Sequence, residues 1–181
     1  MKLFGRRTAD LKTARLRLVS ITPAMLKAEE AGNGSLEKIL GAELTAEWPP
    51  EHWEPHVYHF IQKQYEDEPR TRGWHRYVLL PNRGGGATPY TLIGAVGAFP
   101  KLEGDAEIGY STVPSFQRKG YATEAARALV EWLLTQKDVM SVSAQTYPSL
   151  PESIKVMERC GMTYVGPGED EGTVRYLRRR S

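Results

Sequence analysis

The sequence of 181 residues contains a single cysteine, Cys160, which excludes a disulfide within the chain and any metal site built from several cysteines. It also lacks an apolar run long enough to span a membrane, and charged residues break up its first 18 positions, so we expect no signal peptide. Net charge is small as well, since 24 basic and 22 acidic residues leave +2, and the chain as a whole offers no strong attraction to nucleic acid. These absences predict a cytoplasmic protein that binds neither membranes nor nucleic acid.

Length and composition are those of one ordinary globular domain, with 40% hydrophobic and 25% charged residues. The first 13 residues are basic, and we predict that residues 1–13 form a loosely held arm and that residues 14–181 form a single domain. A basic terminus can also contact nucleic acid, but a solvated tail is the commoner use. Homodimers are common among soluble oligomers, although no residue of the sequence identifies an interface.

Apolar periodicity and turn residues indicate strands and helices in mixed order. The predicted strands cover 14–21, 74–80, 90–99, a segment from 105 to about 113, 139–146, 162–165 and 173–177. One predicted helix starts at Thr22–Pro23, and the others cover 35–40, 53–66, a segment from 121 to about 136, and 152–159. The glycines at 84–86 precede a β-rich run rather than a helix, so we interpret 81–89 as a hairpin connection and not as a phosphate loop. The last two strands read as an antiparallel hairpin, and the fold class is mixed α/β.

The segment Gln117–Ala122 lies between a predicted strand and the start of a predicted helix. The first backbone N–H groups of a helix have no acceptor within it, and the helix dipole gives that end a partial positive charge. Gly120 permits a positive φ and Ala122 is small, so an anion can approach the main chain closely. Arg118 and Lys119 add positive charges. The segment is therefore a candidate phosphate-binding loop.

Three linked segments carry a resemblance to a known family. The pattern Gln117-x-x-Gly120-x-Ala122 resembles the Q/R-x-x-G-x-G/A acetyl-CoA signature of the GNAT (Gcn5-related) N-acetyltransferase superfamily. The segment EIGYSTVPSFQRKGYATEA at 107–125 is similar to the strand-to-helix segment of its RimJ/RimL-like branch, and residues 153–162 resemble the next helix of that branch. The motif match covers roughly the last half of the chain, while the first half agrees only in broad pattern.

The resemblance implies a single-domain GNAT fold, in which a mixed, mostly antiparallel twisted sheet is flanked by helices and the fourth and fifth strands splay apart. Acetyl-CoA would lie in that gap as a co-substrate, with its pantetheine arm against the fourth strand and its pyrophosphate on the loop. The implied cofactor-binding residues are Tyr110, Ser111, Thr112, Val113, Gln117, Arg118, Lys119, Gly120, Tyr121, Ala122, Thr123 and Ser153.

Acetyl transfer to an amine needs a group that takes a proton from the amine. Glu103, Asp105 and Glu107 stand at i, i+2 and i+4, so an extended backbone would turn all three to one face. The resemblance favours Glu107, which matches an acidic position near the acceptor amine in the RimJ/RimL-like branch. Partial burial there would raise its pKa toward a value suited to a base. A surface carboxylate or an ion-pair partner is the alternative role for Glu107.

The leaving thiolate needs a proton, and the resemblance implies that it comes from the loop or helix after the fifth strand. Ser153 matches the serine of an N-x-x-S pattern, but Leu150 stands where the asparagine is usual. Ser153 could instead cap the start of the helix. Tyr147 is the second candidate acid, because a phenol with a pKa of about 10 can protonate a thiolate. We interpret Cys160 as a core residue rather than as an acyl-carrying nucleophile.

The helices after the first strand form one wall of the acceptor pocket in the resembled family, which suggests Trp48, His52 and Trp53 as acceptor-binding residues. Simple packing of the aromatic rings and surface exposure of the histidines are the alternatives. His52, His56 and His59 also stand at helical spacing, but without an acidic or cysteine partner, and the resemblance requires no metal.

Together these features predict an acetyl-CoA-dependent N-acetyltransferase in which the amine attacks directly within a ternary complex. The acceptor would be a protein N-terminus or a small amine, and the sequence does not identify it. A rival interpretation is a non-catalytic acyl-CoA-binding sensor, which the missing asparagine favours. A nucleotide-dependent phosphotransferase is a weaker rival, because the glycine is not followed by Lys and Ser or Thr and no magnesium carboxylate is evident.

Overall fold

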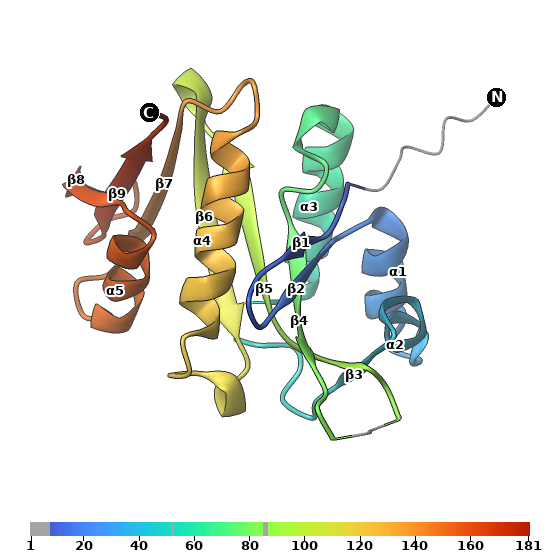
Figure 1. The fold of residues 1–181 in the computed structure, drawn as a ribbon. Coiled ribbons are helices and arrows are strands. Elements are labelled where there is room, and N and C mark those ends of the chain that lie inside the picture. The colour runs from blue at the N-terminus through green and yellow to red at the C-terminus, as the bar shows by residue number, and fades with distance from the viewer. Residues whose placement is uncertain (1–7, 52, 85–86) are drawn as a thin grey trace.

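A mixed β-sheet forms the middle layer of the molecule (Figure 1). The computed structural model describes residues 8–51, 53–84 and 87–181. Within them the sheet has nine strands in the order β1-β2-β4-β5-β6-β7-β9-β8, and β3 pairs with β5 off this path. The strands are β1 Leu11–Lys12, β2 Arg17–Ser20, β3 Ala42–Leu44, β4 Arg76–Pro81, β5 Tyr90–Pro100, β6 Asp105–Thr112, β7 Ser141–Thr146, β8 Thr163–Pro167 and β9 Val174–Arg179.

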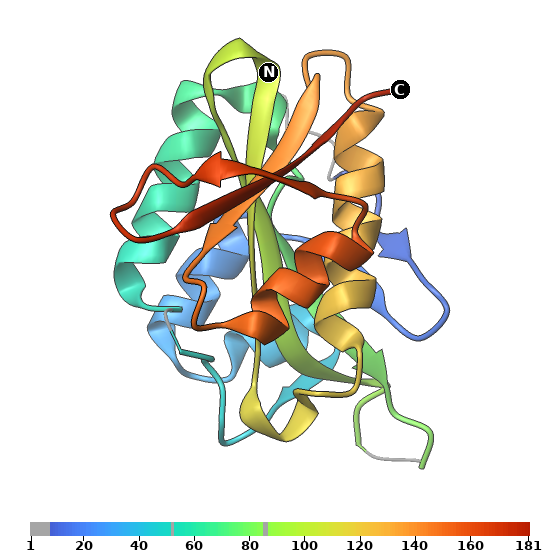
Figure 2. The ribbon, with the colours of Figure 1, turned by 90° about the vertical axis from the view of Figure 1, so that its left-hand side faces the viewer.

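Helices cover both faces of the sheet, with α1 and α3 on one side and α4 on the other (Figure 2). The α-helices are α1 Pro23–Ala31, α2 Ser35–Leu40, α3 Pro55–Asp67, α4 Tyr121–Leu134 and α5 Pro151–Arg159, and short 3-10 turns occupy Pro69–Thr71 (η1), Leu102–Gly104 (η2) and Pro114–Phe116 (η3). The buried residues form two clusters, one under α4 and α5 and one under α1, α2 and α3. None of the helices in the described residues is long and apolar enough to cross a membrane.

Helix α4 is the central element on its face, and its apolar stripe explains its position. Ala125, Ala126, Leu129 and Leu133 recur at helical spacing and are buried against the sheet. The helix links β6 to β7, which run parallel, as a crossover connection requires. Small alanines in its first turns let the helix approach the sheet closely, and the η3 turn with the loop before Gly120 connects the end of β6 to the start of α4.

Strands β6 and β7 are paired along only part of their length. The parallel register joins Asp105–Glu107 to Ser141–Ser143, while β6 runs on to Thr112 and β7 to Thr146. On its other side β6 stays paired with β5 from Ala106 to Thr112. The two central strands therefore diverge beyond Glu107, which confirms the predicted splayed pair, and the sheet is otherwise antiparallel except where β3 meets β5.

Most predicted elements are confirmed within a few residues, and the terminal pair β8 and β9 is an antiparallel hairpin as expected. Two short strands were not predicted. Strand β1 falls inside the predicted arm and pairs with β2, and β3 pairs with β5 about 48 residues further along the chain. Each has three residues or fewer, too short to show an alternating pattern. Residues 1–7 of the predicted arm lie outside the described residues.

The shared face predicted for Glu103, Asp105 and Glu107 is wrong for Glu103. This residue has φ 57° and lies in the η2 turn, before β6 begins. Gly104 follows it with φ 75°, so the chain makes a tight turn there instead of an extended approach. Only Asp105 and Glu107 lie in the strand.

Candidate active site

The start of α4 exposes backbone donors. Gly120 is the N-cap residue with φ 80°, and it has no side chain to cap the helix. In the described part of the chain, no acceptor takes the N–H groups of Tyr121, Ala122 or Thr123, whereas the N–H of Glu124 binds the Gly120 carbonyl at 3.0 Å. Three donors thus face outward at the positive end of a 14-residue helix, as an anion-binding site requires.

The loop before Gly120 is held by its own side chains. Gln117 Nε2 donates to the Thr112 carbonyl at 2.9 Å, and Lys119 Nζ donates to the Ser115 carbonyl at 2.8 Å. Arg118 has φ 60°, a conformation that few non-glycine residues adopt. The loop residues predicted to contact the cofactor therefore do lie together around the start of α4.

A carboxylate in the first turn of α4 fixes this loop to the β1–β2 hairpin. Glu124 accepts hydrogen bonds from Thr13 Oγ1 at 2.5 Å, from the Arg15 N–H at 2.8 Å and from Arg15 Nε at 2.6 Å. Arg15 also donates to the Lys119 carbonyl at 3.0 Å. Burial alone would raise the pKa of Glu124, but the hydrogen bonds from Thr13 and Arg15 outweigh burial and hold this pKa below its ordinary value. These hydrogen bonds were not predicted from the sequence, because Thr13 and Arg15 lie more than 100 residues before their partners in the chain.

Tyr110 and Ser153 form a hydroxyl pair beside the gap between β6 and β7. The Tyr110 hydroxyl lies 2.9 Å from Ser153 Oγ and donates to the Ser153 carbonyl at 3.0 Å. Burial raises the pKa of Tyr110 to about 12. The capping alternative for Ser153 is wrong, since Leu150 is the N-cap residue of α5 and Ser153 Oγ bonds to Tyr110. Tyr147, the other candidate acid, is 51% exposed beyond the end of β7.

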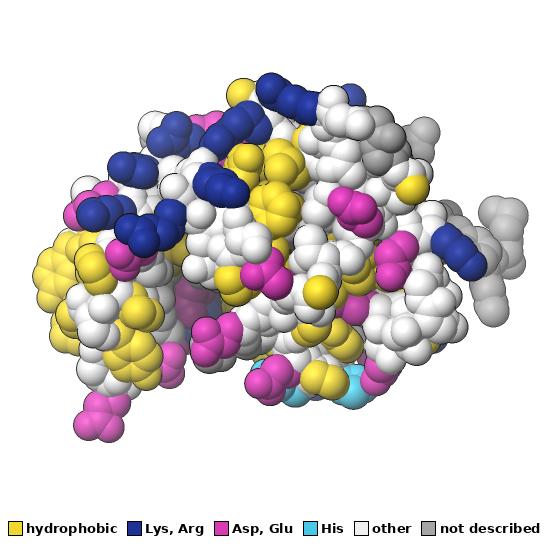
Figure 3. All heavy atoms as spheres, turned by 90° about the horizontal axis from the view of Figure 1, so that it is seen from below, with side chains coloured by type: hydrophobic (Ala, Val, Ile, Leu, Met, Phe, Trp, Pro, Cys, Tyr) yellow, Lys and Arg dark blue, Asp and Glu magenta, His cyan; other side chains and the backbone are white. Residues whose placement is uncertain are grey.

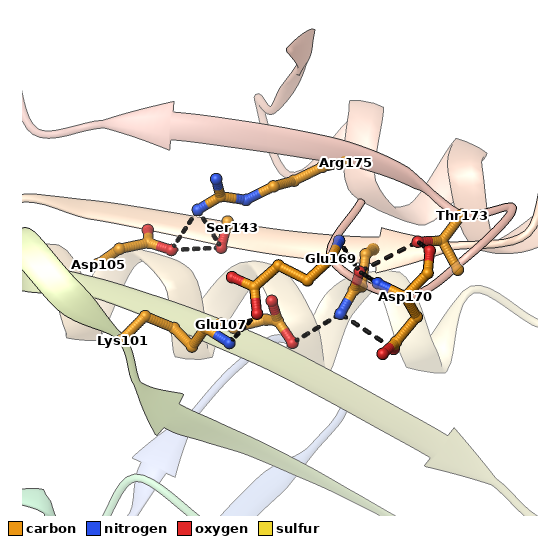
Figure 4. A network of polar contacts seen from close by, with 9 residues as sticks. Lys101, Asp105, Glu107, Ser143, Glu169, Asp170, Thr173 and Arg175 are labelled. Atoms are coloured by element: carbon orange, nitrogen blue, oxygen red, sulfur yellow. Dashed lines mark hydrogen bonds and ion pairs between the residues drawn. The ribbon is translucent and has the colours of Figure 1, made fainter. Parts of the chain in front are cut away.

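Glu107 is half-buried where β6 and β7 diverge. Its Oε1 accepts a hydrogen bond from Gln145 Nε2 at 3.3 Å, and its Oε2 is buried with no hydrogen-bond partner in the described residues (Figure 4). Burial raises the pKa of Glu107 above its ordinary value, and the positive charge of Lys101 opposes this increase. A carboxylate with one unsatisfied buried oxygen and a raised pKa is suited to accept a proton.

Asp105 lies two residues before Glu107 in β6, and both of its carboxylate oxygens accept hydrogen bonds. Its Oδ1 accepts from Ser141 Oγ at 2.7 Å. Its Oδ2 accepts from Ser143 Oγ and from Arg175 Nη2, the latter at 2.8 Å (Figure 4). The residue is 7% exposed. Because both oxygens serve a buried network, Asp105 has a structural role that joins β6, β7 and β9.

The two tryptophans proposed to bind the acceptor pack against the core under α1–α3. Trp48 Nε1 and Trp53 Nε1 each donate to Glu29 Oε1 at 2.8 Å, and the Tyr77 hydroxyl donates to Glu29 Oε2. Trp48 also lines a cavity of about 220 Å³ with Glu29 and other residues of α1 and α2. The segment between β3 and α3 reaches the gap through the Glu51 carbonyl, which accepts from Ser111 Oγ at 3.3 Å. An acceptor role for the tryptophans stays a prediction.

His52 lies outside the described residues, and its predicted acceptor role stays a prediction. His56 and His59 are exposed on α3, and each lies beside a different glutamate, Glu54 or Glu30. In the ranges that the structure describes, no three His, Cys, Asp or Glu side chains are grouped to hold a metal ion. Cys160 is buried in the core under α4 and α5, and burial raises the pKa of its thiol to about 11, so it stays protonated.

Charge is distributed unevenly around the site. The view from below shows Lys and Arg side chains gathered at the upper left, on the side of α4 and α5, and acidic side chains across the middle and lower part of this face (Figure 3). An anionic ligand is therefore attracted to the α4 side of the gap. The uncapped start of α4, the diverging strands and this positive side together fit acetyl-CoA, whose diphosphate would meet the loop.

Comparisons with known proteins agree with this geometry. A family model described as "Acetyltransferase (GNAT) domain" matches residues 20–163. The Bacillus subtilis protein named "Uncharacterized N-acetyltransferase YjdG" is 29% identical over 153 residues, which cover 83% of this chain and 88% of that protein. An acetyltransferase structure from Agrobacterium tumefaciens covers 99% of both chains with a TM-score of 0.64 and 20% identity.

A structure of RimL, a ribosomal L7/L12 alpha-N-protein acetyltransferase, in complex with coenzyme A covers 94% of this chain and 98% of its own, with a TM-score of 0.60 and 17% identity. At this identity the likeness concerns the fold. The family match spans the sheet from the end of β2 to the start of β8, including the loop and the diverging strands. The chain therefore belongs to the GNAT acetyltransferase family, whose acetyl donor is acetyl-CoA, and is an acetyltransferase.

Proposed function

We propose that this acetyltransferase transfers the acetyl group of acetyl-CoA to a primary amine by direct attack in a ternary complex, with Glu107 as the base. The observation that carries the proposal is the half-buried Glu107 carboxylate at the point where β6 and β7 part, with one oxygen unsatisfied. The donor supplies an acetyl thioester when bound. Residues of this chain must bind the diphosphate, remove the proton from the amine and supply a proton to the leaving sulfur.

Each group has a defined task in this proposal. The N–H groups at the start of α4 bind the diphosphate, and Arg118 adds charge from an exposed position. Glu107 accepts the proton that the amine loses as its nitrogen bonds to the acetyl carbon. The carbon–sulfur bond then breaks, and the hydroxyl pair of Tyr110 and Ser153 supplies the proton that the sulfur takes up.

Two classes of acceptor amine are compatible with this site. The RimJ/RimL-like resemblance supports a protein N-terminus, and RimL itself is named an alpha-N-protein acetyltransferase. A small primary amine is the other class. We also propose a cytoplasmic location, which the single cysteine supports. Thiol release with a panel of peptides and small amines would separate the two acceptor classes.

The test of the base is Glu107→Gln, measured as kcat against pH together with acetyl-CoA affinity by calorimetry. We expect kcat to fall about 100-fold with unchanged affinity, because the amide cannot accept the proton. Since burial raises the pKa of Glu107, the wild-type rate should decline on the acid side at a pH above the ordinary value of 4.5. Glu131→Gln, on the exposed side of α4, is the matched control and should leave both quantities unchanged.

Two results would contradict the proposal in different ways. A wild-type rate in Glu107→Gln would assign proton removal to another group or to water. Binding of acetyl-CoA without thiol release on any acceptor would favour the sensor interpretation that the leucine at position 150 suggests.

A further inference from the structure

Gln145 of β7 holds both the candidate base and the loop between β8 and β9. Its Oε1 accepts hydrogen bonds from the N–H of Glu169 at 2.8 Å and the N–H of Asp170 at 3.3 Å, and it lies 3.1 Å from Thr173 Oγ1. Its Nε2 donates to Glu107 Oε1 at 3.3 Å and to Asp170 Oδ2 at 3.2 Å. Because two backbone N–H groups face the oxygen, the NH₂ group must face the carboxylates.

The loop that Gln145 holds is built to receive this amide. At Gly168 a Cβ atom would lie 2.5 Å from Gln145 Oε1 and 2.0 Å from Thr173 Oγ1, so only glycine allows the close approach. Thr173 closes the loop by donating to the Asp170 carbonyl at 2.6 Å. On the far side of the gap, Lys101 Nζ pairs with Glu169 Oε2 at 2.5 Å (Figure 4). The 168–173 loop therefore crosses from β9 toward β5 beside Glu107.

Charged groups from four elements surround Glu107. Lys101 follows β5, Asp105 precedes Glu107 in β6, Arg175 belongs to β9, and Glu169 and Asp170 belong to the 168–173 loop. Lys101 and Arg175 favour the ionised carboxylate, and Glu169 opposes it. In the described part of the chain, Gln145 is the one group that donates a hydrogen bond to the Glu107 carboxylate. Such a bond favours the charged form and fixes its orientation.

We infer that Gln145 is a positioning residue, which orients Glu107 for proton removal and holds the 168–173 loop as a wall beside it. The inference rests on the proposed role of Glu107 as the base. A glutamine suits this task because a neutral amide presents an acceptor to one side and a donor to the other. Glutamate would direct negative charge at Glu107, and methionine would fill the same space without either hydrogen bond.

The test uses Gln145→Met and Gln145→Glu in the full chain, with Gln136→Met, just beyond the C-terminal end of α4, as the matched control. For Gln145→Met we expect kcat to fall about tenfold and the acid limb of its pH profile to move up by roughly one pH unit, because the donor to the charged form is lost. Gln145→Glu should move the limb further. Titration of the Glu107 carboxyl by ¹³C NMR should show the same order without any substrate.

Further measurements distinguish positioning from a merely structural role. Acetyl-CoA affinity should stay unchanged, and adding Gln145→Met to Glu107→Gln should cost no additional activity, since Gln145 acts through Glu107. A pH profile and a Glu107 titration that match wild type would overturn the inference, even if the variant melted at a lower temperature. If Glu107→Gln were itself fully active, the proposed base would fail as well, whereas an inactive Glu107→Gln beside a wild-type Gln145→Met would reject Gln145 alone.

Discussion

Successive side chains of β6 point to opposite faces of the sheet, and this alternation separates the two groups proposed to handle protons. Ile108 and Tyr110 face the core under α4 and α5. Ser111, of the same parity as Glu107, contacts the segment before α3. The strand thus presents the proposed base to the side of α1–α3 and the proposed hydroxyl acid to the side of α4, three residues apart. An acetyl group held between them would meet each from a different side.

Removing each hydroxyl group of the Tyr110–Ser153 pair should lower kcat by a different factor. Tyr110→Phe should lower kcat about 10- to 100-fold, because the proton donor is lost. Ser153→Ala should cost less, since the Tyr110 hydroxyl still has the Ser153 carbonyl as a partner. Because burial raises the pKa of Tyr110 to about 12, this group should cause no decline of kcat below about pH 10. Steady-state rates from pH 6 to 10 check both points. A larger loss in Ser153→Ala or in Tyr147→Phe would move the acid role to that residue.

At the scale of an element, the start of α4 depends on a glycine in a conformation that other residues disfavour. Gly120→Asp should weaken coenzyme A binding more than 100-fold, because a carboxylate at this position competes for the exposed N–H groups and repels the diphosphate. Arg118→Ala should weaken it only about threefold to tenfold, since that side chain is exposed and adds charge alone. Calorimetric titration with coenzyme A measures both.

The control for this prediction is Gly34→Asp. Gly34 is the N-cap residue of α2 with φ 78°, close to the 80° of Gly120, so the substitution meets a similar backbone cost on the other side of the sheet. It should destabilise the fold by about 1 kcal/mol and leave coenzyme A affinity unchanged. If Gly34→Asp and Gly120→Asp bound coenzyme A with equal affinity, the loop at Gly120 would not be part of the coenzyme A binding site.

At the scale of the whole molecule, one buried histidine ties stability to pH. His75 lies between Tyr65 and Phe99 with its Nε2 3.0 Å from Gln64 Oε1, and burial lowers its pKa from 6.5 to about 3. Gln64 donates to the Ala98 carbonyl, so its oxygen accepts and His75 Nε2 carries the hydrogen. The native state therefore holds His75 neutral, while the unfolded chain protonates it near pH 6.5.

The sign of the effect follows from proton binding. Between pH 6.5 and about 3 the unfolded state binds more protons at His75 than the native state, so the free energy of unfolding should fall as pH falls through this range. Urea unfolding at several pH values from 7.5 to 4 measures it. His75→Gln should be less stable at pH 7.5, by about 1–3 kcal/mol, but should lose less stability on acidification. If the free energies of unfolding of the wild type and of His75→Gln depended on pH in the same way, His75 would be excluded as the cause of the acid destabilisation.

The sequence predicted what local pattern determines. The α4 stripe, the glycine before it and the strand that precedes it are all readable within 32 residues, and the structure has them in the predicted order. Two sets of hydrogen bonds were not predictable, those between Arg15 and Glu124 and those of Gln145. Their partners meet only when strands that are distant in the sequence pair. Glu103 shows the opposite failure, since its spacing suggested an extended chain that the turn at Gly104 interrupts.

The division of the interior into two buried clusters has a consequence for how such an enzyme can change. The sheet separates the cluster under α4 and α5 from the cluster under α1–α3, and the two share none of their buried residues. Substitutions on distant, separately packed sites have nearly additive effects. Substitutions around the cluster under α1–α3, where the two tryptophans suggested as acceptor-binding residues pack, should therefore leave the packing under α4 and α5 unchanged. A directed-evolution library confined to residues 22–67 would exploit this independence.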